Sequence, residues 1–334
     1  MTLQQAPVRI AIVGAGAIGG VMAAKLAALP GVRLSVLARG ATLIAMQRDG
    51  LRLTDALGSR VVTLLASDDP ADLGTQDLVI VAVKGPALAA VAPKVRTLLA
   101  PDGVVLIAMN GLPWWFFNGV GGACEGLALQ SVDPGGTIAA AMPDHQVIGS
   151  VVHMSSATTA PGQVHHRSGN GLIIGEPRGG KSARVETLSR LLRDAGFDVA
   201  VSERIQYDIW YKLWGNMTMN PVSALTGASC DRILADPLVL AFVSAVMLEA
   251  QAIGAHFGCA IDQTPEDRHA VTAKLGAFKT SMLQDVEAGR AVELDALLGG
   301  VREVAQHLGL QTPHTDALLG LTRLMAQTRG LYPN

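Results

Sequence analysis

Three polar residues recur at four-residue intervals in an otherwise apolar stretch of the sequence: Lys212, Asn216 and Asn220. Residues four positions apart share a face of an α-helix, so the apolar residues between them predict a helix with one polar line. A lysine next to Trp210 and Trp214 loses water around its ammonium and releases its proton more readily near neutral pH, while amides can orient a polar ligand. The alternative is that Lys212 extends to solvent and the asparagines cap neighbouring turns.

A glycine-rich stretch near the start of the sequence has the surroundings of a nucleotide-binding loop. The apolar run Val8–Val13 predicts a β-strand and Val21–Leu29 predicts a helix. Between them lie Gly14, Ala15, Gly16, Ala17, Ile18 and Gly19. In this context the first glycine permits a tight turn, the second lets the backbone approach a pyrophosphate, and the third lets helix and strand pack closely. We therefore expect dinucleotide binding; the alternative is a tight structural turn.

Arg39 ends the next predicted strand, Arg33–Ala38. Proteins that prefer NAD usually have an acidic residue at this point to hold the ribose 2′-hydroxyl, whereas an arginine accommodates the 2′-phosphate of NADP. A guanidinium can bind that phosphate through two N–H donors, and Thr42 could add a hydroxyl contact. The sequence thus predicts NADP(H) as the cofactor; the alternative is an ordinary surface arginine.

Length and composition indicate a two-domain cytoplasmic enzyme. The chain has 334 residues, of which 49% are hydrophobic, and a net charge of −2 at pH 7. We find no run of the ~20 uncharged apolar residues that a membrane span needs, and Met1–Pro7 is too polar for a signal peptide. The scattered charges argue against a nucleic-acid partner. The 3 cysteines and 8 histidines lack the spacing of a disulfide framework or a metal site.

Strands and helices alternate through the first part of the chain. Leu51–Thr54 and Arg60–Leu65 could form a hairpin, and the helix Ala87–Leu99 lies between the apolar strands Leu78–Val83 and Val104–Met109. This alternation predicts an α/β domain with a doubly wound parallel sheet of the Rossmann type.

Lys84 and Asn110 directly follow the two apolar strands just described. The carboxyl ends of parallel strands line the ligand-binding crevice of such a sheet, so both side chains are candidates for ligand contact. Asn110-Gly111 is also a common turn dipeptide, and for both positions turn formation is an equally good interpretation.

The later part of the chain reads as helical. Long amphipathic patterns cover Gln206–Met219, Leu238–Phe257, Pro265–Glu287, Ala291–Leu308 and Thr315–Gln327. We expect a Rossmann-type domain over residues 1–202 and an all-helical C-terminal domain over 203–334. Glu293 follows Gly289 closely, so the helix is expected to break there and turn the carboxylate toward the ligand. From residue type alone, Glu293 and Asp295 are also typical of exposed acids in a first helical turn.

Taken in order and spacing, these motifs resemble the ketopantoate reductase (2-dehydropantoate 2-reductase) family. The resemblance extends from the glycine loop, through Lys84 and Asn110-Gly111, to Lys212, Asn216 and Asn220-Pro221, and then to Ser281-Met282-Leu283-Gln284-Asp285 and Glu293-Leu294-Asp295. It implies a Rossmann domain followed by a helical domain, with the active site in the cleft between them. It also implies NADPH as hydride donor and a 2-oxo acid as acceptor, here 2-dehydropantoate, which is reduced to pantoate in pantothenate biosynthesis.

The resemblance also implies individual roles. Lys212 corresponds to the lysine that donates a proton or strong hydrogen bond to the ketone oxygen, and Glu293 to the acid that holds and polarises it beside the cofactor. The implied substrate contacts are Asn110, Asn216, Asn220 and Ser281. The implied cofactor contacts are the loop Gly14–Gly19, Arg39, Lys84, Asn110, Ser155 and Glu293.

Two departures from the family pattern concern the substrate. The aromatic residues Trp114–Phe117 and the segment Ser131–Gly136 lie in a longer connection, and they either reshape the acceptor pocket or bury the inserted segment or a dimer surface. Near Cys230 the sequence lacks an amide that the family often has. A paralogous NADP-dependent reductase of another 2-oxo acid or hydroxyacid therefore remains an alternative. A non-enzymatic NADP sensor is a further one, and a homodimer is compatible with each.

Overall fold

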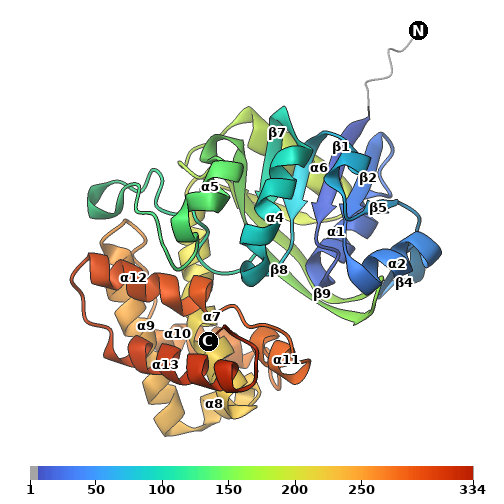
Figure 1. Ribbon diagram of the computed structural model, residues 1–334. Helices are drawn as coiled ribbons and strands as arrows, with labels where there is room; N and C mark the ends of the chain where they lie inside the picture. The colour runs from blue at the N-terminus through green and yellow to red at the C-terminus, as the bar shows by residue number, and fades with distance from the viewer. Residues whose placement is uncertain (1–6, 334) are drawn as a thin grey trace. The chain divides into compact units, whose positions relative to one another are not determined.

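The chain folds as two compact units, and one inserted segment belongs to the second. The computed structural model describes residues 7–333 (Figure 1). The first unit comprises residues 7–109 and 137–205, and the second comprises 110–136 and 206–333. The segment Met1–Pro7, which we expected not to be a signal peptide, lies outside the described residues except for Pro7.

The first unit is a sheet flanked by helices, as the alternating sequence pattern predicts. Its parallel part has the order β5-β2-β1-β6-β7-β8. The strands are β1 (Val8–Val13), β2 (Val32–Leu37), β5 (Leu65–Ser67), β6 (Gln76–Val81), β7 (Leu99–Ile107) and β8 (Val147–Ala160). The helices are α1 (Ala17–Leu26), α2 (Gly40–Asp49), α3 (Pro70–Leu73), α4 (Gly85–Leu98), α5 (Thr137–Ala141) and α6 (Ala183–Asp194). The predicted Rossmann-type fold is confirmed, and the strand order reverses at β1.

The other half of the sheet was only partly predicted. The expected hairpin exists as β3 (Leu51–Asp55) and β4 (Gly58–Val62), which pair antiparallel. Beside it runs a long antiparallel pair, β8 with β9 (Gln163–Gly175), and β10 (Asp198–Ser202) joins β9 in parallel. The sequence analysis missed this pair because the end of β8 and the start of β9 are rich in polar residues and glycine. They therefore carry no continuous apolar signal.

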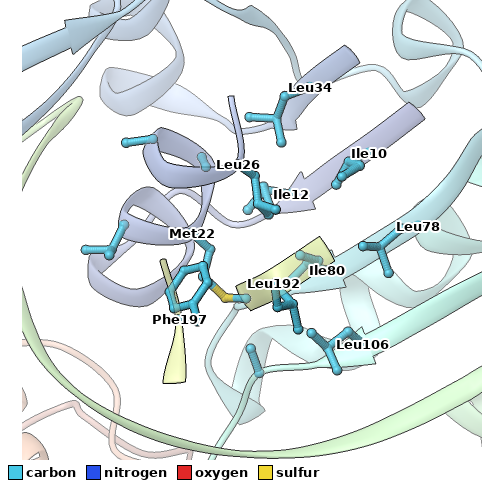
Figure 2. Packing of buried hydrophobic residues seen from close by; sticks show 14 of the residues in the cluster. Ile10, Ile12, Met22, Leu26, Leu34, Leu78, Ile80, Leu106, Leu192 and Phe197 are labelled. Carbon is cyan, nitrogen blue, oxygen red and sulfur yellow. The ribbon is translucent and has the colours of Figure 1, made fainter. Parts of the chain in front are cut away.

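Helix α1 packs closely on the sheet, directly after β1 and the glycine loop. Met22 and Leu26 meet Ile10, Ile12 and Phe197 in the buried core of the unit (Figure 2). The approach is possible because Gly19 has no side chain: a Cβ there would lie 2.0 Å from the backbone oxygen of Gly14. The third glycine of the loop therefore has the packing role that the fingerprint predicts.

The second unit is helical. Its helices are α7 (Ile205–Thr226), α8 (Cys230–Ala235), α9 (Pro237–Ala255), α10 (Pro265–Ala273), α11 (Ser281–Glu287), α12 (Gly300–His307) and α13 (Pro313–Thr328). The helical C-terminal domain is confirmed, but two expected helices were wrong in extent. The pattern Pro265–Glu287 is divided, because Gly276 adopts a left-handed φ of 61° and Thr280 caps a new helix. The pattern Ala291–Leu308 becomes helical only at a π-helical turn, Asp295–Gly299.

The inserted segment 110–136 packs with the helical unit through its aromatic residues. Trp114–Phe117 are all buried, and the rings of Phe116 and Phe117 lie 5.8 Å and 5.2 Å from that of Phe257. The interpretation that these side chains bury the inserted segment is confirmed. The division by contacts therefore differs from the expected division 1–202 and 203–334 in this segment.

Helix α9 is the one helix within residues 7–333 that is long and apolar enough to cross a membrane, judged by length and composition alone. The sequence analysis did not expect such a stretch. A core helix passes the same test, so a single case is weak evidence. Glu249 in its middle accepts hydrogen bonds from the backbone N–H groups of His314 and Thr315 at the start of α13. The charged side chain is thus used to cap a neighbouring helix.

The glycine loop yields a test that separates packing from ligand approach. Gly19→Ala should lower the free energy of unfolding by about 1–3 kcal/mol, because its Cβ meets backbone at 2.0 Å. Gly16→Ala is the matched control, since no atom lies within 4 Å of the added Cβ, and its effect should stay within about 0.5 kcal/mol. Thermal unfolding followed by circular dichroism measures both. Equal losses in the two variants would contradict the packing role of Gly19.

Candidate active site

The lysine of the polar line lies on a helix most of whose residues are buried. In α7 the neighbours Trp210, Leu213 and Trp214 are at most 2% exposed, and Trp214 donates its indole N–H to the backbone oxygen of Met247 at 2.8 Å. Lys212 is only partly exposed, so the interpretation that it simply extends to solvent is not supported. Its Nζ donates a hydrogen bond to Oδ1 of Asn110 at 2.8 Å. The structure therefore joins two residues that are far apart in the sequence.

Asn110 is held by the turn in which it lies. Gly111 has a φ of 84°, and a Cβ there would lie 2.6 Å from that of Ala296. The N–H of Leu112 donates to the backbone oxygen of Ala296 at 2.8 Å. The bend at Asn110-Gly111 thus fixes the backbone and directs the amide to Lys212, while contact of Asn110 with a ligand stays a prediction.

Glu293 lies in the non-helical stretch between α11 and the π-helical turn, as the break after Gly289 predicts. Two hydrogen bonds hold the residues that precede Glu293. Arg290 donates through Nε to Asp285 at 3.0 Å, and the N–H of Val292 donates to the backbone oxygen of Leu331 at 3.1 Å. Asp295, the other acid considered, accepts a hydrogen bond from Tyr332 and is partly buried. It has a structural role in the π-helical turn.

The surroundings of Lys212 lower its pKa from 10.5 to about 8. Burial of the ammonium is the largest cause, the negative charge of Glu293 raises the pKa, and the positive charge of Arg268 lowers it. An amine with a pKa near 8 is largely protonated at neutral pH and can still give up its proton, which is the requirement for a general acid.

The remaining polar residues that we predicted to bind the substrate all lie in the second unit. Asn220 is buried, and its Nδ2 donates to Oγ of Ser281 at 3.5 Å, a long hydrogen bond. Asn216 lies between Lys212 and Asn220 along α7 and is partly buried. The structure thus holds six of the predicted site residues in one unit: Asn110, Lys212, Asn216, Asn220, Ser281 and Glu293.

Arg268 is a charged neighbour of this group that the sequence analysis missed. Its guanidinium lies over the ring of Tyr211, with Cζ 5.0 Å from the ring centre. A signal was available in Gly215, because a glycine inside a helix usually marks the close approach of another group. A Cβ at Gly215 would lie 2.8 Å from two nitrogen atoms of Arg268.

The predicted cofactor residues form a second group in the first unit. Gly14 has a φ of 95° and turns the chain from β1 into α1, whose first N–H groups follow the open position at Gly16. Such groups suit a pyrophosphate. Arg39 and Lys84 are the N-cap residues of α2 and α4, each following a parallel strand. Arg39 is exposed, and its side chain has no hydrogen-bond or ion-pair partner within residues 7–333, so its guanidinium is available to a phosphate.

Ser155 lies in β8, opposite Ser168 of β9, where the strand register shifts on both sides of it. Such irregularities expose backbone groups that a regular ladder would pair. The geometry is compatible with the expected backbone contact to a ligand. Within the described residues, no group of three or more His, Cys, Asp or Glu side chains could hold a metal ion.

Comparison with known proteins gives matches along most of the chain. The family model described as "Ketopantoate reductase PanE/ApbA" matches residues 10–114, and "Ketopantoate reductase PanE/ApbA C terminal" matches residues 204–326. A 2-dehydropantoate 2-reductase from Mesorhizobium japonicum is 42% identical over 324 residues, covering 97% of this chain and 99% of the relative.

Solved structures give the same picture. A protein from Ralstonia solanacearum MolK2 that was assigned to ketopantoate reductases superposes with a TM-score of 0.93 at 56% identity, covering 97% of this chain and 99% of that one. A D-mandelate dehydrogenase solved with NADH and anilino(oxo)acetate has a TM-score of 0.82 at 19% identity, covering 97% of this chain and all of that one. At that identity the second structure shows only a shared fold.

The lowered pKa of Lys212 gives a prediction that does not depend on any ligand. Below pH 8 both the folded and the unfolded chain hold the proton, and the folded state bears the full cost of burying the ammonium. Between pH 8 and 10.5 only the unfolded chain holds it, so the stability of the wild type rises with pH. Lys212→Met lacks this proton. Its stability relative to the wild type should therefore be greatest below pH 8 and decline toward pH 10.5.

Urea unfolding at several pH values measures this difference. Lys274→Met is the control, because Lys274 is exposed at the end of α10 and should give a pH-independent difference. Parallel stability curves for the wild type and Lys212→Met would show that the lysine has an ordinary pKa.

Proposed function

The chain belongs to the ketopantoate reductase family, and on that premise we propose that it reduces 2-dehydropantoate to pantoate with NADPH. The observation that carries this proposal is the partly buried amine of Lys212, hydrogen-bonded to Asn110 and under the charge of Glu293. A cationic proton donor of this kind suits carbonyl reduction, because negative charge develops on the carbonyl oxygen as hydride reaches the carbon. The product would serve pantothenate biosynthesis.

A bound reduced nicotinamide would supply a hydride to C2 of the 2-oxo acid. In the proposed reaction Lys212 gives the proton to the carbonyl oxygen. The C=O double bond becomes a C–O single bond, a new C–H bond forms at C2 and a new O–H bond forms at the oxygen. The amine left behind recovers its proton from solvent. Asn110 fixes the direction of the amine by accepting its hydrogen bond. Glu293 keeps the pKa of the lysine from falling further and so keeps the acid form populated at neutral pH.

We assign substrate binding to Asn216, Asn220 and Ser281, in addition to Asn110. These amides and the hydroxyl offer both donors and acceptors, as a hydroxylated carboxylic acid requires. The hydrogen bond between Asn220 and Ser281 is long at 3.5 Å and therefore easily exchanged for contacts to a ligand.

We assign the dinucleotide to the first unit, where Gly14–Gly19, Arg39, Lys84 and Ser155 would hold it. The open position at Gly16 fits a pyrophosphate, and the exposed guanidinium of Arg39 fits the 2′-phosphate that distinguishes NADP from NAD. We also include Asn110 and Glu293 as contacts to its nicotinamide end, on the family resemblance.

A second candidate is a reductase of a different 2-oxo acid. It is favoured by the residues that follow the polar line: Cys230 is 2% exposed and donates its N–H to the backbone oxygen of Phe278 at 2.9 Å. A buried thiol offers fewer hydrogen bonds than the amide expected at this point. This composition suits an acceptor with a less polar side chain.

Steady-state oxidation of NADPH tests the two candidates directly. We expect the highest kcat/KM with 2-dehydropantoate among a panel that includes bulkier and aromatic 2-oxo acids. Lys212→Ala should lower kcat by ~10²-fold or more with NADPH binding retained, and Lys274→Ala should leave it unchanged. A preference for another acid would favour the second candidate. Absence of turnover with every acid would instead indicate a non-enzymatic nucleotide-binding protein.

Arg39→Asp tests the cofactor assignment. The substitution removes donors to the 2′-phosphate and adds a repelling charge, so it should raise the Kd for NADPH by ~10- to 100-fold, from about 1.5–3 kcal/mol for hydrogen bonds to a charged group. The Kd for NADH should change little. Arg33→Asp is the control, since Arg33 is exposed on β2, the strand that precedes Arg39. Equal losses for both dinucleotides, measured by fluorescence titration, would remove the argument for NADP.

A further inference from the structure

Gly215 in the middle of α7 makes room for a side chain from another helix. Glycine inside a helix is about 1 kcal/mol less favourable than alanine, so its presence in α7 has a local cost. A Cβ at this position would lie 2.8 Å from both Nε and Nη2 of Arg268 and 3.2 Å from its Cζ. The equal distances show that the Nε–Nη2 edge of the guanidinium faces the glycine. Any larger residue would displace the guanidinium.

The guanidinium is also held from the side. Its Cζ lies 5.0 Å from the centre of the Tyr211 ring, within the range of a cation–π interaction. The hydroxyl of Tyr211 donates to Gln263 at 2.7 Å, which fixes the ring. Tyr211 and Gly215 are one turn apart on the face that Arg268 covers. Lys212 directly follows Tyr211, so its stem leaves the helix beside that face.

Hydrogen bonding does not explain why an arginine occupies this place. Its Nε is buried and has no hydrogen-bond partner among the side chains and backbone of residues 7–333. An unsatisfied buried donor is costly and calls for a functional explanation. What the side chain does bring is a charge that does not titrate in the physiological range.

We propose that Arg268 is a positioning residue for the Lys212 amine, and that its permanent charge opposes that of Glu293 and favours release of the proton. The role in catalysis rests on the proposed function, whereas the effect on the amine does not. Both charged groups act on the pKa of Lys212, which Glu293 raises and Arg268 lowers, while burial lowers it most. The balance between them allows the lysine to be protonated at rest and still acidic enough to protonate an alkoxide oxygen.

Other titratable groups on α10 do not account for a transition near pH 8. Asp267 closes the capping box at the start of the helix with Thr264, and Glu266 lies in the same first turn. His269 is partly buried with its pKa lowered from 6.5 by burial, so it titrates on the acidic side of neutrality. A transition near pH 8 is therefore not that of His269, and its absence in Lys212→Met assigns it to Lys212.

The test compares Arg268→Met, which removes the charge, with Arg268→Lys, which keeps it. The pKa of Lys212 is measured in each protein by NMR titration of labelled lysine side chains, with Lys212→Met identifying the resonance. In parallel, the alkaline limb of the pH profile of kcat/KM for reduction is recorded. We expect Arg268→Met to move both transitions to higher pH by about 0.5 or more, and Arg268→Lys to leave them near the wild-type values.

Gly215→Ala provides a second route to the same result, because it displaces the guanidinium and leaves Arg268 in the sequence. It should shift the transition in the same direction as Arg268→Met, and it serves as the test if that variant does not fold. Unmoved transitions in all variants would overturn the proposal. An increase in KM for the 2-oxo acid with an unmoved transition would also overturn it, since Arg268 would then bind the substrate carboxylate. If the wild type has no turnover, the NMR titration still decides the effect on the amine.

Discussion

The arrangement of the helical unit follows from placing a charged amine on a largely buried helix. An ammonium removed from water is stable only if acceptors and an opposite charge are brought to it. Asn110 supplies the acceptor at 2.8 Å, and Glu293 supplies the charge. Both residues come from non-helical segments of the unit.

The inserted segment 110–136 can be understood from this requirement. It carries Asn110 into the helical unit, and its aromatic residues secure it there by packing around Phe257. The turn at Asn110-Gly111 meets Ala296 in the π-helical turn that follows Glu293. Single-turn π-helices are often found at functional sites, since they alter the direction of the adjoining chain. The contact between this bend and the π-helical turn thus fixes the backbone near both Asn110 and Glu293.

In both units a glycine inside a helix allows another part of the chain to approach that helix closely. Gly19 lets α1 pack against the loop before it, and Gly215 admits the guanidinium of Arg268 to the side of α7. In each case the residue lowers local helix stability and is explained by the group it admits. The first could be inferred from a known fingerprint. The second belongs to no fingerprint, and the group it admits is decided by the approach of Arg268 on α10 to Gly215.

The sequence alone determined the order and type of most elements and the residue types of both groups. Periodicity and the glycine loop are local signals, and β1 was predicted with its observed bounds, Val8–Val13. Four-residue spacing likewise placed Lys212, Asn216 and Asn220 on one helix, because this depends only on helix geometry. The tertiary structure decided what local patterns cannot encode: the division of Pro265–Glu287 into two helices, the β8–β9 pair, and the unit to which Trp114–Phe117 belong. It also decided the pKa of Lys212, since desolvation and the charges of Glu293 and Arg268 act through space between segments distant in the chain.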